Sequence, residues 1–182
     1  MRWLCALVLL ACVVSPPLGA SSDAITHLRV QDSRATSALR EGLLKSATLR
    51  KLVAQIESSN MFVYVTLNPF MKSRLAGQTT WMGKSKEFRY LRVAINGDLM
   101  PDQIIATLGH ELRHVVEVID DESVVDEGTL VSLYRRIGRP SSPDIPSGWE
   151  TEAAQDAGLQ VRRELRTAAT VAIDRTSELT KS

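Results

Sequence analysis

Apolar residues recur at helical spacing in several segments of the chain. Within residues 47–59 they fall every three or four positions, at Leu49, Leu52, Val53 and Ile56. Ser46 precedes this run as a candidate N-cap. The same spacing predicts helices over 34–45, 101–119, 124–137 and from Ser147 to at least Ala168. We expect the polar tail from about residue 169 to fray.

Shorter runs of β-branched and aromatic residues predict strands over 26–31, 61–67, 78–82 and 88–95. The polar turn 83–86 joins the last two. Within 88–95, the apolar side of the alternation is formed by Leu91, Val93 and Ile95. Residues 138–147 hold three of the seven prolines and predict a loop. Helices, then strands, then helices predict an α+β fold, with a small antiparallel β-sheet beside a helical half.

The N-terminus has the layout of a secretory signal peptide. Arg2 is followed by an apolar run over residues 3–14, and small residues end at Ala20. The run is shorter than the roughly 20 residues that a membrane-spanning helix needs. We therefore expect residues 1–20 to be cleaved and the protein to be secreted or periplasmic. Residues 9–12 also resemble a lipobox, so a lipoprotein anchored at Cys12 is the alternative.

The remaining residues, 21–182, are expected to form a single domain without a membrane span. Cys5 and Cys12 leave with the signal peptide, so we expect neither disulfides nor thiol chemistry. The full chain has 22 basic and 21 acidic residues, a net charge of +1. This balance argues against a general nucleic-acid-binding protein, which normally carries a basic excess.

The chemistry is indicated by residues 110–114, His-Glu-Leu-Arg-His, which match H-E-x-x-H. His110 and His114 lie one turn apart on one helix face, so both imidazoles can bind one Zn²⁺. Glu111 projects beside the metal, where it can take a proton from a metal-bound water. The alternative is a surface helix with two incidental histidines.

A catalytic zinc ion normally has a third protein ligand. No third histidine follows at the metzincin spacing, and His27 lies far upstream. Four downstream glutamates compete for the place: Glu117, Glu127, Glu150 and Glu152. Three ligands in line on one helix would diverge along its axis, so we expect Glu117 to lie behind the ligands or in solvent. An acid at 127 opens a helix, where the helix dipole favours it.

The phase of the last predicted helix separates the other two candidates. Its apolar stripe comprises Ala154, Ala157, Val161, Leu165 and Ala168. At 100° per residue Glu150 falls in that stripe, whereas Glu152 points to the opposite side. An acid in a buried stripe needs a partner, and a metal ion supplies one. We therefore favour Glu150 as the third ligand, although it also fits a capping box with Ser147.

The motif helix resembles that of gluzincin-type zinc metallopeptidases. Several stretches resemble, more closely, a group of uncharacterised secreted bacterial proteins that carry H-E-x-x-H. These stretches are 46–53, 63–65, 88–93, 108–114, 133–138 and 149–154. The resemblance implies a zincin-like fold, zinc binding by His110 and His114, and Glu111 as the base. It also places an acid at Glu150, and it implies no substrate.

These observations predict a secreted zinc-dependent peptidase that acts on a peptide or protein substrate. In a zincin, an antiparallel edge strand pairs with the extended substrate, and residues 88–95 are the expected strand. Tyr134, Tyr90 and Arg113 are candidate oxyanion donors. The alternative is a non-catalytic zinc-binding or interaction domain on a zincin-like scaffold. A pro-segment over 21–45 and the oligomeric state stay open.

Overall fold

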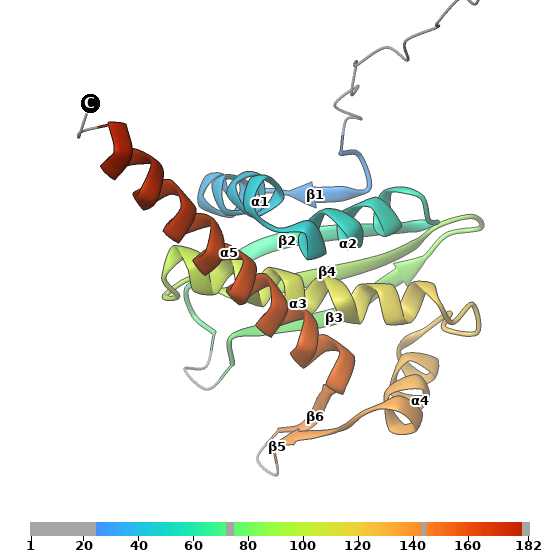
Figure 1. The fold of residues 1–182 in the computed structure, drawn as a ribbon. Coiled ribbons are helices and arrows are strands. Elements are labelled where there is room, and N and C mark those ends of the chain that lie inside the picture. Colours follow the sequence, from blue (N-terminus) through green and yellow to red (C-terminus); the bar gives the residue numbers. More distant parts are fainter. Residues whose placement is uncertain (1–24, 72–74, 143–144, 180–182) are drawn as a thin grey trace, which may run out of the picture.

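The computed structural model describes residues 25–71, 75–142 and 145–179. The predicted signal peptide and the lipobox cysteine lie outside these residues. Among the described helices, none combines the length and the apolar composition that crossing a bilayer requires. Figure 1 shows helices gathered on one face of a small sheet, with a strand hairpin and a short helix beyond one end of that layer.

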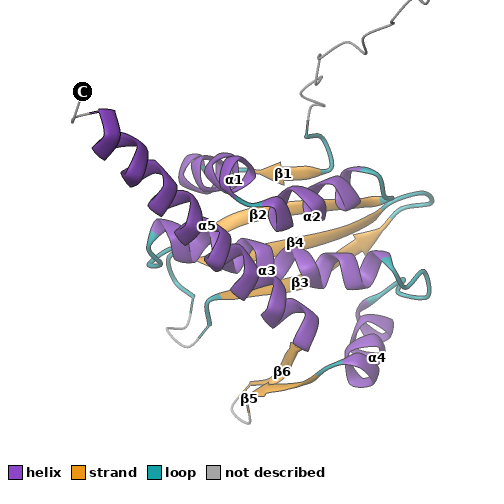
Figure 2. Ribbon diagram, in the orientation of Figure 1, coloured by secondary structure: helices purple, strands orange, loops and turns teal. Residues whose placement is uncertain are grey.

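The chain contains five helices and six strands within these residues. The helices are α1 (Ser33–Lys45), α2 (Ala47–Glu57), α3 (Pro101–Ile119), α4 (Glu127–Ile137) and α5 (Glu152–Leu179). The strands are β1 (Leu28–Val30), β2 (Met61–Asn68), β3 (Gly77–Lys84), β4 (Arg89–Asn96), β5 (Arg139–Ser142) and β6 (Ile145–Glu150). Mixed α and β structure in this order agrees with the predicted α+β class (Figure 2).

The main sheet has the strand order β1-β2-β4-β3 and is mixed. Strands β1, β2 and β4 are parallel, and only β3 runs antiparallel to its neighbour β4. The prediction of an antiparallel sheet was therefore wrong. The reason is that α1 and α2 connect β1 to β2, and such a helical crossover returns the chain in the same direction.

The sheet order also corrects the predicted edge strand. Residues 88–95 form β4, which lies inside the sheet between β2 and β3. The edge strand beside β4 is β3, which the hairpin turn places on the outer side of β4, and β1 is the other edge. The alternation predicted for β4 is confirmed, because Leu91, Val93 and Ile95 are buried. These side chains face the helices.

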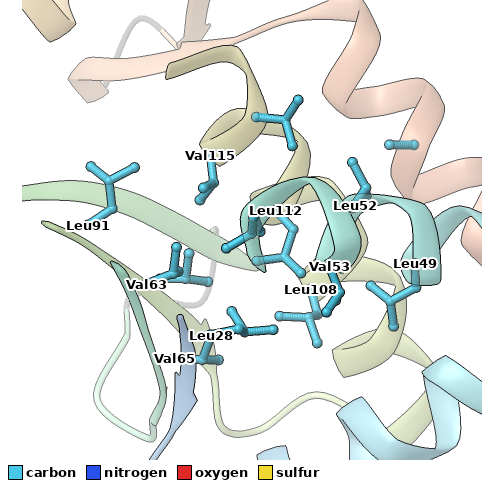
Figure 3. Close-up of a cluster of buried hydrophobic side chains, with 14 of the residues drawn as sticks. Leu28, Leu49, Leu52, Val53, Val63, Val65, Leu91, Leu108, Leu112 and Val115 are labelled. Carbon is cyan, nitrogen blue, oxygen red and sulfur yellow. The ribbon is translucent and has the colours of Figure 1, made fainter. Parts of the chain in front are cut away.

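The core fills the space between the sheet and helices α1, α2 and α3. Figure 3 shows side chains from β1, β2 and β4 meeting those of α2 and α3. The apolar positions predicted for α2 are all buried, and Ser46 is its N-cap, accepting a hydrogen bond from Leu49 N at 3.0 Å. The carboxylate of Glu164 on α5 accepts hydrogen bonds from Ser46 Oγ and Thr48 Oγ1. The long last helix is thereby tied to the start of α2.

Two predicted boundaries move in the structure. Helix α4 begins at Glu127 rather than 124, because Asp126 caps it by accepting a hydrogen bond from Thr129 N at 2.8 Å. Helix α5 begins at Glu152 rather than Ser147. The predicted loop 138–147 instead forms most of the antiparallel hairpin β5–β6. The loop prediction was therefore wrong for most of this segment, because both strands of a two-stranded hairpin are edges, where proline is tolerated.

Helix α3 is fixed at its C-terminal end by Arg89. This buried guanidinium donates hydrogen bonds to Val118 O at 2.8 Å, Asp121 O at 2.9 Å and Ile119 O at 3.3 Å. The carbonyls at a helix end have no partner within the helix, so a cation there satisfies them. Helix α3 is thus anchored to β4 at the end that follows the H-E-x-x-H motif.

Candidate metal centre

His110 and His114 lie one turn apart on α3, with ring centroids 4.9 Å from each other. Glu150, the last residue of β6, approaches both rings. Its Oε1 lies 3.2 Å from His110 Nε2 and 3.6 Å from His114 Nε2. One ligand atom from each of the three residues lies within 4.8 Å of the others. The three side chains form a cluster that could hold a metal ion.

The hairpin β5–β6 brings Glu150 to the histidines. Pairing of Glu150 with Arg139 ends the hairpin, and helix α5 begins two residues later. The phase argument for Glu150 was therefore wrong, because this residue is in a strand and not on the last helix. The stripe itself is confirmed over most of its length, since Ala154, Ala157, Val161 and Leu165 are buried. A capping box with Ser147 is likewise contradicted.

The other acidic candidates lie elsewhere. Glu127 is exposed in the first turn of α4, and Glu152 is exposed in the first turn of α5. Glu117 is buried and its Oε2 lies 2.9 Å from His114 Nδ1, the nitrogen that points away from Glu150. It therefore lies behind His114 rather than in the cluster. His27 packs among aromatic rings beside β2, with its centroid 4.5 Å from that of Phe62.

Glu111 lies next to the cluster without belonging to it. Only 4% of its surface is exposed, and its Oε2 accepts a hydrogen bond from Thr79 Oγ1 at 2.8 Å. Burial raises the pKa of Glu111 above its ordinary value, against the lowering effect of His114, of His110 and of the Thr79 hydroxyl. A carboxylate with a raised pKa in this position is suited to accept and return a proton.

Gly77 makes room for this carboxylate. A Cβ atom at position 77 would lie 2.4 Å from Glu111 Oε1, far inside contact distance. Strand β3 can therefore approach α3 closely only because residue 77 has no side chain. Neither Thr79 nor Gly77 was predicted from the sequence as a site residue. The sequence feature that could have indicated Thr79 is the alternation of the strand predicted over 78–82. This alternation places residue 79 on the side of the sheet that faces the helices.

The histidines and carboxylates of the cluster stabilise each other's charged forms. Burial lowers the pKa of His114, but its hydrogen bond to Glu117 and the nearby carboxylates of Glu150 and Glu111 raise that pKa to about 9. Burial raises the pKa of Glu150, but hydrogen bonds from His110 and His114 lower it to about 2. A cation is thus favoured at this point, and a metal ion can replace the proton on His114.

The donor set could hold a metal ion. Two imidazole nitrogens and one carboxylate oxygen converge, which is the three-ligand arrangement of catalytic zinc sites. The carboxylate comes from a different element than the histidines, so the three ligands surround a common point.

The three predicted oxyanion donors differ in position. Tyr134 is buried, and its hydroxyl donates a hydrogen bond to His114 O at 3.1 Å. Tyr90 stacks on Phe62 on the sheet face opposite α3. Arg113 is partly exposed on α3, with its Nε 3.9 Å from Glu117 Oε1. In this arrangement Tyr134 serves to hold the backbone of the motif helix.

Comparisons with protein-family models, with curated proteins and with solved structures gave no match. The resemblance to gluzincin-type metallopeptidases therefore stays a prediction that rests on the residues and on the geometry of the cluster.

Proposed function

We propose that the protein is a zinc-dependent peptidase with a zincin-like fold, in which His110, His114 and Glu150 hold the ion and Glu111 is the general base. One observation carries this proposal. A buried carboxylate, that of Glu111, lies beside a His-His-Glu donor set but outside it. A purely structural metal site has no need of such a group, and its burial would otherwise only cost free energy.

A zinc ion held by His110, His114 and Glu150 would supply Lewis acidity to a water molecule and to a substrate carbonyl. Glu111 then accepts the proton of the attacking water and delivers it to the leaving amine nitrogen. The Thr79 hydroxyl donates a hydrogen bond to Glu111 Oε2, and Gly77 leaves room for Oε1. The position of the base is thus set by two elements, α3 and β3.

Strand β3 supports a peptide as the substrate. Ala76 O accepts a hydrogen bond from Asn96 N at 2.8 Å, so this pair of residues faces each other through backbone hydrogen bonds. In an antiparallel ladder the next pairs alternate, so backbone groups of Gly77, Thr79 and Trp81 point away from β4. Those groups lie on the free edge of the sheet, next to Glu111. An extended peptide can add to such an edge.

The strand that would receive the substrate is not the one predicted from the sequence. The expected strand, residues 88–95, has neighbours on both sides and no free edge. Strand β3 has the features expected of a zincin edge strand, since it is antiparallel to its neighbour and contacts α3. Secretion through a signal peptide over residues 1–20 is part of the same proposal.

The test combines metal analysis with a peptide-library cleavage screen on the wild type and on Glu111→Gln. We expect one zinc ion per chain in both proteins and cleavage by the wild type alone. Glu152→Gln is the matched control, since this exposed glutamate is outside the cluster and should leave cleavage unchanged. Zinc binding without cleavage by the wild type would favour the non-catalytic zinc-binding alternative. A folded wild type that takes up no zinc would overturn the proposal.

A further inference from the structure

A second buried carboxylate, that of Glu117, lies behind the candidate metal centre. Its Oε2 is 2.9 Å from His114 Nδ1, and its Oε1 accepts a hydrogen bond from Thr151 Oγ1 at 2.6 Å. Only 6% of Glu117 is exposed. The two oxygens of one side chain therefore bridge a metal-ligand candidate on α3 and the residue that precedes α5.

The Glu117 carboxylate is buried together with polar partners. A carboxylate removed from water costs free energy unless polar partners replace the lost hydration. Glu117 has such partners in His114 and Thr151, and Arg113 Nε lies 3.9 Å from its Oε1. Glutamates near the end of an amphipathic helix ordinarily face solvent. This one instead turns inward, to the back of the His114 ring.

The contact determines which nitrogen of His114 is free. A carboxylate only accepts hydrogen bonds, so Nδ1 carries a proton when it faces Glu117. In the neutral ring the lone pair is then on Nε2, the nitrogen that faces Glu150. The arrangement selects the tautomer and the ring orientation that a metal ion at the cluster requires.

Thr151 links this carboxylate to the third member of the cluster. Glu150 and Thr151 are consecutive, and they contact opposite nitrogens of the His114 ring, Glu150 directly and Thr151 through Glu117. Thr151 Oγ1 also accepts a hydrogen bond from Ala154 N at 3.1 Å, which caps the first turn of α5. The junction between β6 and α5 therefore holds His114 from both sides.

We propose that Glu117, held in place by Thr151, is a positioning residue that fixes His114 as a metal ligand through Nε2. The inference rests on the metal centre of the proposed function but not on peptidase activity. It assigns to the β6–α5 junction a role in metal affinity that goes beyond the supply of Glu150.

The test measures the dissociation constant for Zn²⁺ by chelator competition in the wild type and in Glu117→Ala. Loss of a carboxylate behind a ligating histidine typically weakens metal binding by about 10- to 100-fold, and we expect a change of that size. Glu117→Gln keeps a carbonyl oxygen for Nδ1–H and should lose less affinity than the alanine variant. Glu152→Ala is the matched control, and its affinity should stay within about twofold of the wild type because this residue does not contact His114.

Two further readouts keep the test independent of activity and of folding defects. In the zinc-loaded wild type, the His114 Nδ1 proton should be visible by NMR because its hydrogen bond protects it from exchange with solvent. That signal should be lost in Glu117→Ala. If the alanine variant does not fold, Thr151→Val and Thr151→Ser decide, and only the serine variant should retain the zinc affinity of the wild type.

Zinc affinity of folded Glu117→Ala within about twofold of the wild type would overturn the inference, as would an equal loss in Glu152→Ala. If the alanine variant does not fold, equal zinc affinity of Thr151→Val and Thr151→Ser would overturn it. A wild type that binds zinc but cleaves no peptide would contradict the proposed peptidase and leave the positioning role intact. A wild type without zinc affinity would overturn both.

Discussion

Substitution of Gly77 by alanine should disable the general base and leave the metal centre intact. A Cβ atom at this position would lie 2.4 Å from Glu111 Oε1 and 2.8 Å from Thr107 Cγ2, whereas ordinary contacts begin near 3.4 Å. The carboxylate would have to retreat by about 1 Å, a misplacement that can reduce a rate about 100-fold. That loss corresponds to about 2.7 kcal/mol of transition-state stabilisation.

The assay is kcat/KM on a peptide selected from the cleavage screen, together with the dissociation constant for Zn²⁺. Gly77→Ala should lower kcat/KM and leave zinc affinity nearly unchanged, because Glu111 is outside the donor set. Gly128→Ala is the matched control, since a Cβ atom there has ordinary contact with Asp126 Oδ1 at 3.4 Å. Unchanged kcat/KM in Gly77→Ala would refute the role given to Glu111, and so would a parallel loss of zinc.

Three further predictions follow from other contacts. Gly158→Ala would place a Cβ atom 3.2 Å from His110 Cβ, closer than an ordinary contact, and so displace the His110 side chain. Chelator competition should show zinc affinity reduced several-fold. Zinc affinity equal to that of the wild type would contradict the assigned position of His110. Arg89→Met removes the cation from the end of α3 and should lower the free energy of unfolding, measured in urea, by about 3 kcal/mol. A change below about 0.5 kcal/mol would contradict the anchoring role of Arg89. Burial alone would raise the pKa of Glu57, but hydrogen bonds from the backbone N–H groups of residues 26–28 lower it below its ordinary value of 4.5. The stabilisation it provides is therefore complete above its unfolded-state pKa and is lost as pH falls through the lower folded-state pKa. Glu57→Gln should be less stable than the wild type at pH 7, with a difference that shrinks below about pH 4.5, and a difference independent of pH would refute the assignment.

Local patterns were sufficient to predict most helices and the strands of the main sheet. Helix α2 is an example, because its apolar spacing and its cap at Ser46 depend only on residues close in the chain. The order and direction of the strands were not predictable in this way. Whether β4 is an edge or a central strand depends on which segments pair with it. Pairing between strands that are far apart in the chain leaves no signal in the residues of either strand.

The candidate site shows the same division between local and long-range information. His110 and His114 are brought together by helical periodicity alone. Glu150 was favoured by an argument about helix phase that the structure contradicts, and a strand hairpin brings it to the histidines instead. Contacts of Thr79 with Glu111, and of Thr151 with Glu117, join residues that are 32 and 34 positions apart. Such pairs follow from the packing of β3 and of the β6–α5 junction on α3.

The central claim is that His110, His114 and Glu150 form one zinc site. The most direct measurement is the zinc stoichiometry and affinity of the wild type, Glu150→Ala and Glu127→Ala. We predict one zinc ion per chain, at least about a tenfold loss of affinity in Glu150→Ala, and wild-type affinity in Glu127→Ala, whose side chain is exposed away from the histidines. Equal zinc affinity in all three proteins, or a folded wild type that binds no zinc, would contradict the account.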